Sequence, residues 1–128
     1  MFRRTSEAAF VLVVDDDCAI LSAASALLWM QGIGCRTAAS GEEAIDIAAV
    51  EEPALVLVDW HMRRLNGPGV LKCLRQRGLR GPVILMSSHS AGLAEQASEH
   101  GFDGYLEKPF AAADVLELVE RFARPLAV

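Results

Sequence analysis

The stretch Ala54–Leu55–Val56–Leu57–Val58–Asp59 decides the fold of this chain, because five apolar residues run without interruption into one carboxylate. A short, continuous apolar run predicts a strand that is buried on both faces of a parallel sheet. The last residue of such a strand lies at its carboxyl end, where open α/β sheets bind their ligands. Asp59 is therefore the first candidate for a functional residue.

Two more segments are apolar runs of this kind, and a fourth, more mixed segment at residues 102–106 also leads into polar residues. Residues 10–14 precede three aspartates, residues 82–86 precede two serines, and residues 102–106 precede a glutamate and a lysine. The carboxyl ends of parallel strands meet at one edge of a sheet, so we expect these polar side chains to lie together. They are Asp15, Asp16, Asp17, Ser87, Ser88, Glu107 and Lys108.

The remaining sequence predicts helices that alternate with these strands, together with one short, weak strand at 35–38. Helix caps are expected at Asp16 or Asp17 and at Ser40. Helices are predicted at 18–31, at 41–50, from 67 to the turn at 78–81, at 91–100 and at 112–124.

Strict alternation of strand and helix implies the α/β class, with a single doubly wound parallel sheet of five strands and five helices. The common strand order at this size is the flavodoxin-like order 2-1-3-4-5. In that order the first and third strands are neighbours. Asp15, Asp16 and Asp59 should therefore face one another across the switch point of the sheet.

Composition limits the domain organisation and the partners of the 128-residue chain. Its length suits one domain, expected at residues 10–124 between a flexible arm at 1–9 and a C-terminal tail at 125–128. The net charge of -5 argues against direct contact with nucleic acid, and no apolar run approaches the roughly 20 residues that span a membrane. The three cysteines have no zinc-binding spacing and suit a reducing, cytoplasmic location.

The predicted cluster of carboxylates indicates a site that binds a divalent cation and a phosphoryl group. Three carboxylates in one crevice repel one another unless a cation lies between them. All-oxygen ligands favour Mg²⁺, Mn²⁺ or Ca²⁺, and Mg²⁺ commonly takes phosphate oxygens as further ligands. Ser87 can donate a hydrogen bond to a phosphoryl group and Lys108 can place a charge against it. Asp59, alone at the end of the central strand, is the candidate nucleophile for phosphorus.

Four motifs, in their order and spacing, resemble the signature set of response-regulator receiver domains of two-component signalling. They are Val13–Val14–Asp15–Asp16, Asp59–Trp60–His61–Met62 with Gly67, Ser87, and Tyr105–Leu106–Glu107–Lys108–Pro109–Phe110. The resemblance covers about residues 10–124. It implies a signalling phosphoacceptor rather than an enzyme, whose Asp59 takes a phosphoryl group from a histidine kinase or histidine phosphotransfer protein. The downstream target is unknown.

The resemblance also implies a metal site and a switch. Mg²⁺, or Mn²⁺ in its place, would be held by Asp16, Asp59 and the backbone carbonyl of His61, with Asp15 acting through water. Ser87 and Tyr105 would form a coupled switch that alters the surface of the last two helices and the strand between them. The Lys108–Pro109 peptide bond would be cis and direct the lysine into the site.

Two histidines and two departures from the family pattern complete this comparison. His61 and His89 stand two residues after Asp59 and Ser87, at positions that tune the lifetime of the acyl phosphate in this family. Arg63 replaces the usual proline, so the loop after Asp59 is expected to be more mobile. Receivers that dimerise through the switch surface often carry two acids before the tyrosine. Here only Asp103 is acidic, because Gly104 follows it, which argues against that dimer.

One enzyme class is the alternative: a small haloacid-dehalogenase-like phosphatase with Asp15 as its nucleophile. The D-x-D motif at residues 15–17 fits that family, with Ser87 and Lys108 in corresponding roles. The length of the chain argues against it, because such enzymes usually carry a cap domain. Release of phosphate from a small phosphomonoester would distinguish the two classes.

The first helix has an unusual outer face. No charged residue occurs between Asp17 and Arg36, and Trp29 borders a surface of small, uncharged residues. A solvated helix normally carries charges there, so this face predicts a docked partner. The resemblance implies that the partner is the helical bundle bearing the kinase's phosphohistidine. Alternatively, the apolar tail at 125–128 folds back over this face.

Overall fold

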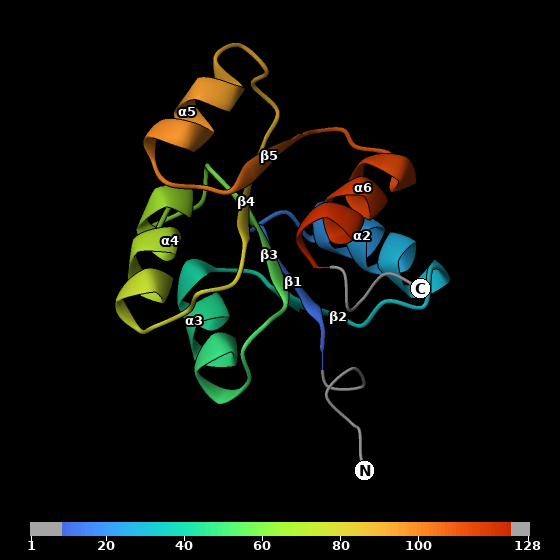
Figure 1. The fold of residues 1–128 in the computed structure, drawn as a ribbon, viewed down its shortest axis with the longest axis horizontal. Helices are drawn as coiled ribbons and strands as arrows, with labels where there is room; N and C mark the ends of the chain where they lie inside the picture. Colours follow the sequence, from blue (N-terminus) through green and yellow to red (C-terminus); the bar gives the residue numbers. More distant parts are fainter. Residues whose placement is uncertain (1–8, 124–128) are drawn as a thin grey trace.

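Parallel strands and helices alternate without exception in the computed structural model, which describes residues 9–123 (Figure 1). The strands are β1 (Val11–Val14), β2 (Cys35–Ala38), β3 (Leu55–Asp59), β4 (Val83–Ser87) and β5 (Gly104–Glu107). The helices are α2 (Cys18–Met30), α3 (Gly41–Val50), α4 (Gly67–Gln76), α5 (Leu93–Glu99) and α6 (Ala112–Phe122). The predicted C-terminal tail, and all but Ala9 of the predicted arm, lie outside the described residues.

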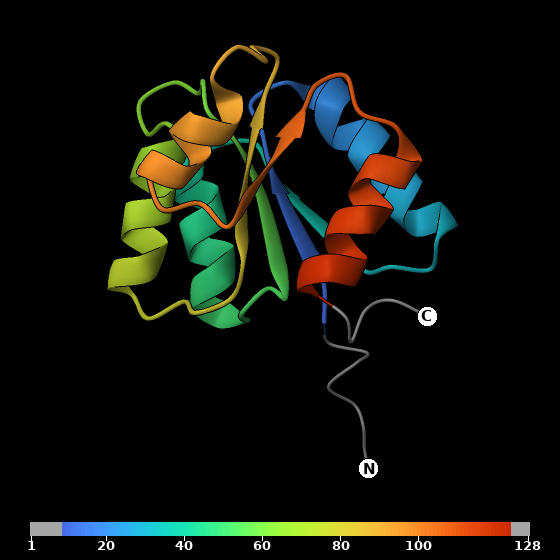
Figure 2. The same ribbon diagram turned by 45° about the horizontal axis from the view of Figure 1, so that its top comes forward.

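The sheet has five strands in the order β2-β1-β3-β4-β5, which confirms the prediction from sequence. The central strand β3 pairs in parallel with β1 and with β4. All residues of these three strands are buried, because helices cover both faces of the sheet. Figure 2 shows α3, α4 and α5 on one face and α2 and α6 on the other.

Alternating side chains of the strands divide the core into two layers. Leu12, Val56 and Leu85 belong to the layer beneath α3, α4 and α5. Their neighbours along the strands, among them Leu57 and Ile84, belong to the layer beneath α2 and α6. Because both faces need apolar residues, the buried strands have continuous apolar runs rather than an alternating pattern.

Polar side chains fix the starts of three helices. Asp17 accepts a hydrogen bond from the backbone N–H of Ala19 at 2.9 Å, so it is the cap of α2. Ser40 caps α3 by accepting from Glu43, as its sequence pattern predicted, and Asn66 caps α4. Each cap pairs a backbone donor that the first turn of a helix would leave without a partner.

Helix α5 is shorter than the sequence predicted. It begins at Leu93, rather than near residue 91, because Gly92 adopts a left-handed conformation with φ of +70° and offers no side-chain cap. It ends at Glu99, and β5 starts at Gly104, two residues later than expected. With seven residues, of which Leu93 and Ala97 are buried, α5 is the shortest helix of the described chain.

No helix in the described part of the chain combines the length and the apolar character that crossing a membrane requires.

Candidate functional site

Three carboxylates lie together where β1 and β3 end. The pairing of Val14 with Val58 aligns the two strands, so Asp15 and Asp16 emerge beside Asp59. One ligand oxygen from each residue lies within 4.8 Å of the others. Asp15 and Asp59 are only 1% and 6% exposed, whereas Asp16 is exposed to solvent. The predicted meeting of these three side chains is confirmed.

Lys108 lies between two of these acids. Its Nζ donates to Asp15 Oδ2 at 2.6 Å and lies 2.8 Å from Asp59 Oδ1. The cation that these carboxylates were expected to need is thus supplied in part by a lysine of the protein itself. The ammonium group compensates part of their charge within the protein itself.

The backbone holds this lysine in place. Lys108 follows β5 directly, and its N–H donates to the Ser87 carbonyl at the end of β4 at 2.8 Å. The Lys108–Pro109 peptide bond is cis, as the resemblance implied. The side chain thus reaches across the ends of β4 and β3 to the acids that follow β1.

Burial and charge act in opposite directions on these groups. Burial raises the pKa of Asp59, the hydrogen bond with Lys108 lowers it, and the charge of Asp15 raises it again; the net direction is upward. Burial lowers the pKa of Lys108, but its bonds to Asp15 and Asp59 outweigh that effect and raise it overall. Lys108 therefore remains an ammonium ion at neutral pH, and the site keeps a cation beside its central acid.

Ser87 ends the strand next to Asp59. Asp59 pairs with Met86 across the sheet, so Ser87 lies one residue further toward the functional edge. The side chain is buried, and its Oγ accepts a hydrogen bond from the His89 N–H at 3.0 Å. This bond leaves the hydroxyl proton available for donation.

The loop after Asp59 returns close to the end of its own strand. Gly67 donates from its N–H to the Trp60 carbonyl at 3.0 Å. A Cβ at Gly67 would lie 2.7 Å from the Asp59 carbonyl oxygen, so only glycine permits this approach. The loop of residues 60–66, which includes Arg63, therefore begins and ends beside the carboxyl end of β3. Its greater mobility remains a prediction.

Aromatic side chains meet around the rim in contacts that the sequence analysis did not foresee. The rings of His61 and His89 have centroids 5.6 Å apart, and both side chains are exposed. Trp60 meets His100 edge to face at 4.9 Å. His61 and His89 share the spacing of two residues after Asp59 and Ser87, and that spacing was the only signal for their proximity.

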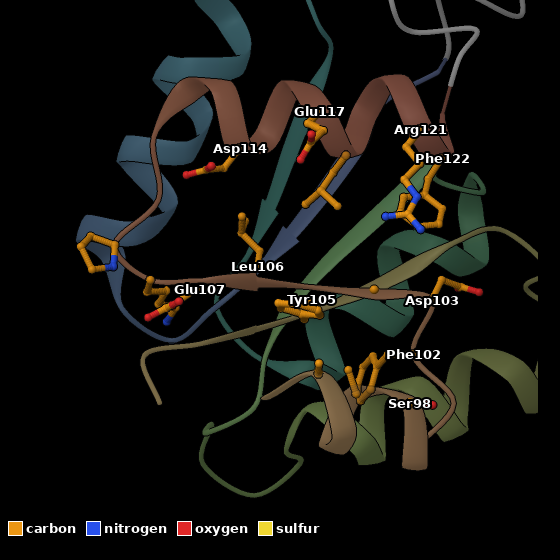
Figure 3. Close-up of a pocket in the computed structure, with 16 residues that line it drawn as sticks. Ser98, Phe102, Asp103, Tyr105, Leu106, Glu107, Asp114, Glu117, Arg121 and Phe122 are labelled. Carbon is orange, nitrogen blue, oxygen red and sulfur yellow. The ribbon is translucent and has the colours of Figure 1, made fainter. Parts of the chain in front are cut away.

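Tyr105 lies away from the acids, on β5 between α5 and α6 (Figure 3). It is 49% exposed, so in this structure the phenol points to the surface rather than into the core. Asp103, two residues earlier, accepts from Arg75 Nη2 at 3.0 Å and from the Val83 N–H at 2.8 Å. Arg75 also donates to the Gly81 carbonyl at 2.7 Å. This network was missed because its members are far apart in sequence.

Trp29 is 81% exposed near the end of α2. It borders a shallow hollow of about 450 Å³ that includes Ser22, Ser25 and Thr37. Trp29 follows Cys18 by eleven residues, so it lies about 16 Å along the helix from the end nearest the acids. The alternative cover, the tail at 125–128, falls outside the described residues.

Comparison with known proteins identifies the class. Residues 11–120 match the family model of the response regulator receiver domain. The chain is 36% identical over 110 residues to the DNA-binding transcriptional regulator NtrC of Klebsiella pneumoniae, covering 85% of this chain and 24% of that protein. It is 33% identical over 115 residues to the response regulator MprA of Mycolicibacterium vanbaalenii, covering 89% of this chain and 50% of that protein.

The structure is also similar to the chemotaxis protein CheY4 of Vibrio cholerae. The TM-score is 0.82 at 27% identity, covering 89% of this chain and 98% of the CheY4 chain. This chain therefore belongs to the family of response-regulator receiver domains, the class defined by its fold and acidic edge. The alternative family, that of the haloacid-dehalogenase-like phosphatases, is therefore rejected. The chain spans about a quarter of the length of NtrC and half that of MprA.

Proposed function

We propose that this domain is the phosphoacceptor of a two-component system, with Asp59 as the residue that is phosphorylated. A histidine kinase or a histidine phosphotransfer protein would supply the phosphoryl group. The observation that carries the proposal is the position of Asp59 between Asp15, Asp16 and Lys108. That arrangement places a nucleophilic oxygen, cation ligands and a fixed positive charge around one point.

In the proposed reaction a carboxylate oxygen of Asp59 attacks the phosphorus of a phosphohistidine. The new O–P bond forms as the P–N bond breaks, and the leaving imidazole keeps the electron pair and takes up a proton. The product is an acyl phosphate. Lys108 already neutralises charge beside Asp59 and is positioned to pair with a phosphoryl oxygen, while Ser87 can donate its hydroxyl proton to another.

The donor set fits a hard divalent cation, because all of its members are oxygens. We assign Asp16, Asp59 and the backbone carbonyl of His61 as ligands of Mg²⁺, or of Mn²⁺ in its place, with Asp15 acting through water. When bound, the ion would neutralise charge that develops on the phosphoryl oxygens. Asp16 supplies the exposed carboxylate through which the ion can enter.

The signal would leave the site through Ser87 and Tyr105. If Ser87 moves toward the phosphoryl group, it vacates space into which Tyr105 can turn from its half-exposed position. The surface formed by α5, β5 and α6 would change with it. The short α5 suits such a change because no side chain caps its start and its seven residues make only about two turns of helix.

Further residues of the proposed function lie outside this core. The outer face of α2, with Trp29 at its far end, is assigned to docking of the kinase's helical bundle. His61 and His89 stand at the rim, where their side chains would control access of water to the acyl phosphate and thus its lifetime.

The domain itself would work in the cytoplasm, a reducing compartment that its three free cysteines suit. NtrC is named as DNA-binding, but the net charge of -5 gives this chain no basis for direct contact with nucleic acid. The downstream target is unidentified.

Labelling with acetyl phosphate and Mg²⁺, followed by mass spectrometry, tests the proposal. We expect one phosphoryl group on Asp59 and none in the Asp59→Asn variant. Labelling at Asp15, or catalytic release of phosphate from a small phosphomonoester, would instead overturn the assignment of Asp59 as the phosphoacceptor.

A further inference from the structure

A groove of about 600 Å³ lies between α5 and α6, over the edge strand β5. In Figure 3, Glu117 and Arg121 extend from α6 toward this space, with Tyr105 on the strand. Apolar side chains form part of its wall, including Phe102 and Phe122. Gly104 contributes to this shape, because a Cβ there would lie 3.4 Å from the Phe122 ring.

The charges around the groove are unequal. The lining includes four acids, Asp103, Glu107, Asp114 and Glu117, and two bases, Lys108 and Arg121. Lys108 is turned into the catalytic edge, where it pairs with Asp15 and Asp59. Asp103 is paired with Arg75. The charges left for a ligand are therefore three carboxylates and one guanidinium group, and Arg121 lies over the Phe122 ring at 5.0 Å.

We propose that this groove binds a basic segment of another protein, with lysines or arginines flanking one large apolar side chain. The apolar side chain would contact the aromatic wall, and the cations would lie against Glu107, Asp114 and Glu117. A second copy of this chain is a poor occupant, since each copy would offer only one free guanidinium group, Arg121, against three free carboxylates of the other. Nucleic acid and anionic membranes would be repelled by them.

Tyr105 connects this groove to the site, a link that rests on the proposed function. Its half-exposed phenol occupies part of the groove in this structure. An inward turn on phosphorylation of Asp59 would enlarge the apolar part of the groove. Binding of the basic segment would then be tighter in the phosphorylated state.

The test uses a synthetic amphipathic peptide of lysine and leucine, with a glutamate and leucine peptide as counterpart. Binding to the 128-residue chain is followed by NMR shifts of backbone amides, with and without beryllofluoride, which stands in for the phosphoryl group. We expect the lysine peptide alone to bind, with shifts in α5, β5 and α6. Glu117→Lys should weaken this binding about tenfold, because an attractive charge becomes repulsive.

Asp46→Lys is the matched control, because Asp46 is an exposed acid on α3, which packs near the opposite edge of the sheet. It changes the net charge equally and should leave binding within roughly a factor of two, since solvent and salt screen distant charges. The proposal is overturned if neither peptide binds in either state, if both variants weaken binding alike, or if the chain dimerises through this face.

Acetyl phosphate labelling of the same samples tests the phosphoacceptor role of Asp59 independently of peptide binding. Binding that depends on Glu117 without any label on Asp59 would retain the groove and reject the phosphoacceptor. A label on Asp59 without peptide binding would support the phosphoacceptor role and reject the proposed function of the groove.

Discussion

Lys108 Nζ lies 2.8 Å from Asp59 Oδ1 across the carboxyl edge of the sheet. The contact joins the residue after the last strand to the final residue of the central one, and the same nitrogen also pairs with Asp15. Without a bound metal, the domain thus holds two buried acids around one ammonium ion. This relationship governs both stability and reactivity, because the cation that neutralises Asp59 is also the one proposed to neutralise its phosphoryl group.

The first prediction concerns this cation. Lys108→Met should lower the free energy of unfolding by about 3 kcal/mol at pH 7, because it leaves two buried carboxylates without their partner. The loss should shrink as the pH falls and one acid takes up a proton. The raised pKa of Lys108 means that the parent protein keeps this stabilisation until strongly alkaline pH.

Urea unfolding at several pH values measures the effect. Lys72→Met is the matched control, since Lys72 is exposed on α4 and should change stability by less than about 0.5 kcal/mol. Equal stability of the two variants would contradict the role assigned to the Lys108 pairs.

The second prediction concerns the raised pKa of Asp59. A carboxyl whose pKa is raised by folding stabilises the native state below its ordinary pKa, and that contribution is lost as the pH rises through the raised value. Asp59→Asn, measured without metal, should therefore unfold at a higher urea concentration than the parent at pH 7. The difference should diminish toward acid pH. A variant less stable than the parent at pH 7 would show that Lys108 pairing outweighs burial.

Metal binding is the third prediction. Millimolar Mg²⁺ should raise the melting temperature by about 4 °C, because a ligand present at a few times its Kd stabilises the folded state by about 1 kcal/mol. Asp16→Ala should abolish the response, whereas Asp46→Ala should retain it. Chelation of the metal should restore the original melting curve, and an unchanged curve for the parent would argue against the metal site.

The fourth prediction tests the switch. Beryllofluoride should change amide hydrogen exchange in α5 and β5, because Ser87 and Tyr105 would couple the site to these elements. Asp59→Asn should show no such change. If exchange changed only in the loops beside Asp59, the proposed coupling of the site to Tyr105 would be wrong.

The fifth prediction concerns docking on α2. Trp29→Glu should reduce phosphoryl transfer from the cognate kinase about tenfold or more, because a hydrophobic contact in an interface is replaced by a charge. Labelling by acetyl phosphate and thermal stability should stay near parental values, since Trp29 is 81% exposed. Val50→Glu, at an exposed apolar residue on α3, is the control. A fall in stability with equal loss from both donors would show that Trp29 is structural.

Local patterns in the sequence determined the framework of this protein. The apolar run at residues 54–58 predicted the buried strand, and its final Asp59 predicted the functional edge. Ser40 predicted one helix start and the aspartates at 16 and 17 another, where the structure has Asp17 as the cap, because capping depends on residues within one turn. Strict alternation of strands and helices predicted the parallel sheet, and its strand order was expected because 2-1-3-4-5 is the common order at this size. The predicted ends of α5 were wrong, since the left-handed Gly92 delays the start of a helix that has few apolar residues.

Only the tertiary structure decided which polar side chains, distant in sequence, contact one another. Lys108 and Asp15 are 93 residues apart in sequence, and their 2.6 Å contact depends on the register of four strands. The pairing of Arg75 with Asp103 and the meeting of His61 with His89 depend on loop paths in the same way. Apolar periodicity specifies which face of an element is buried, but it contains no information on distances between polar groups that separate strands bring together.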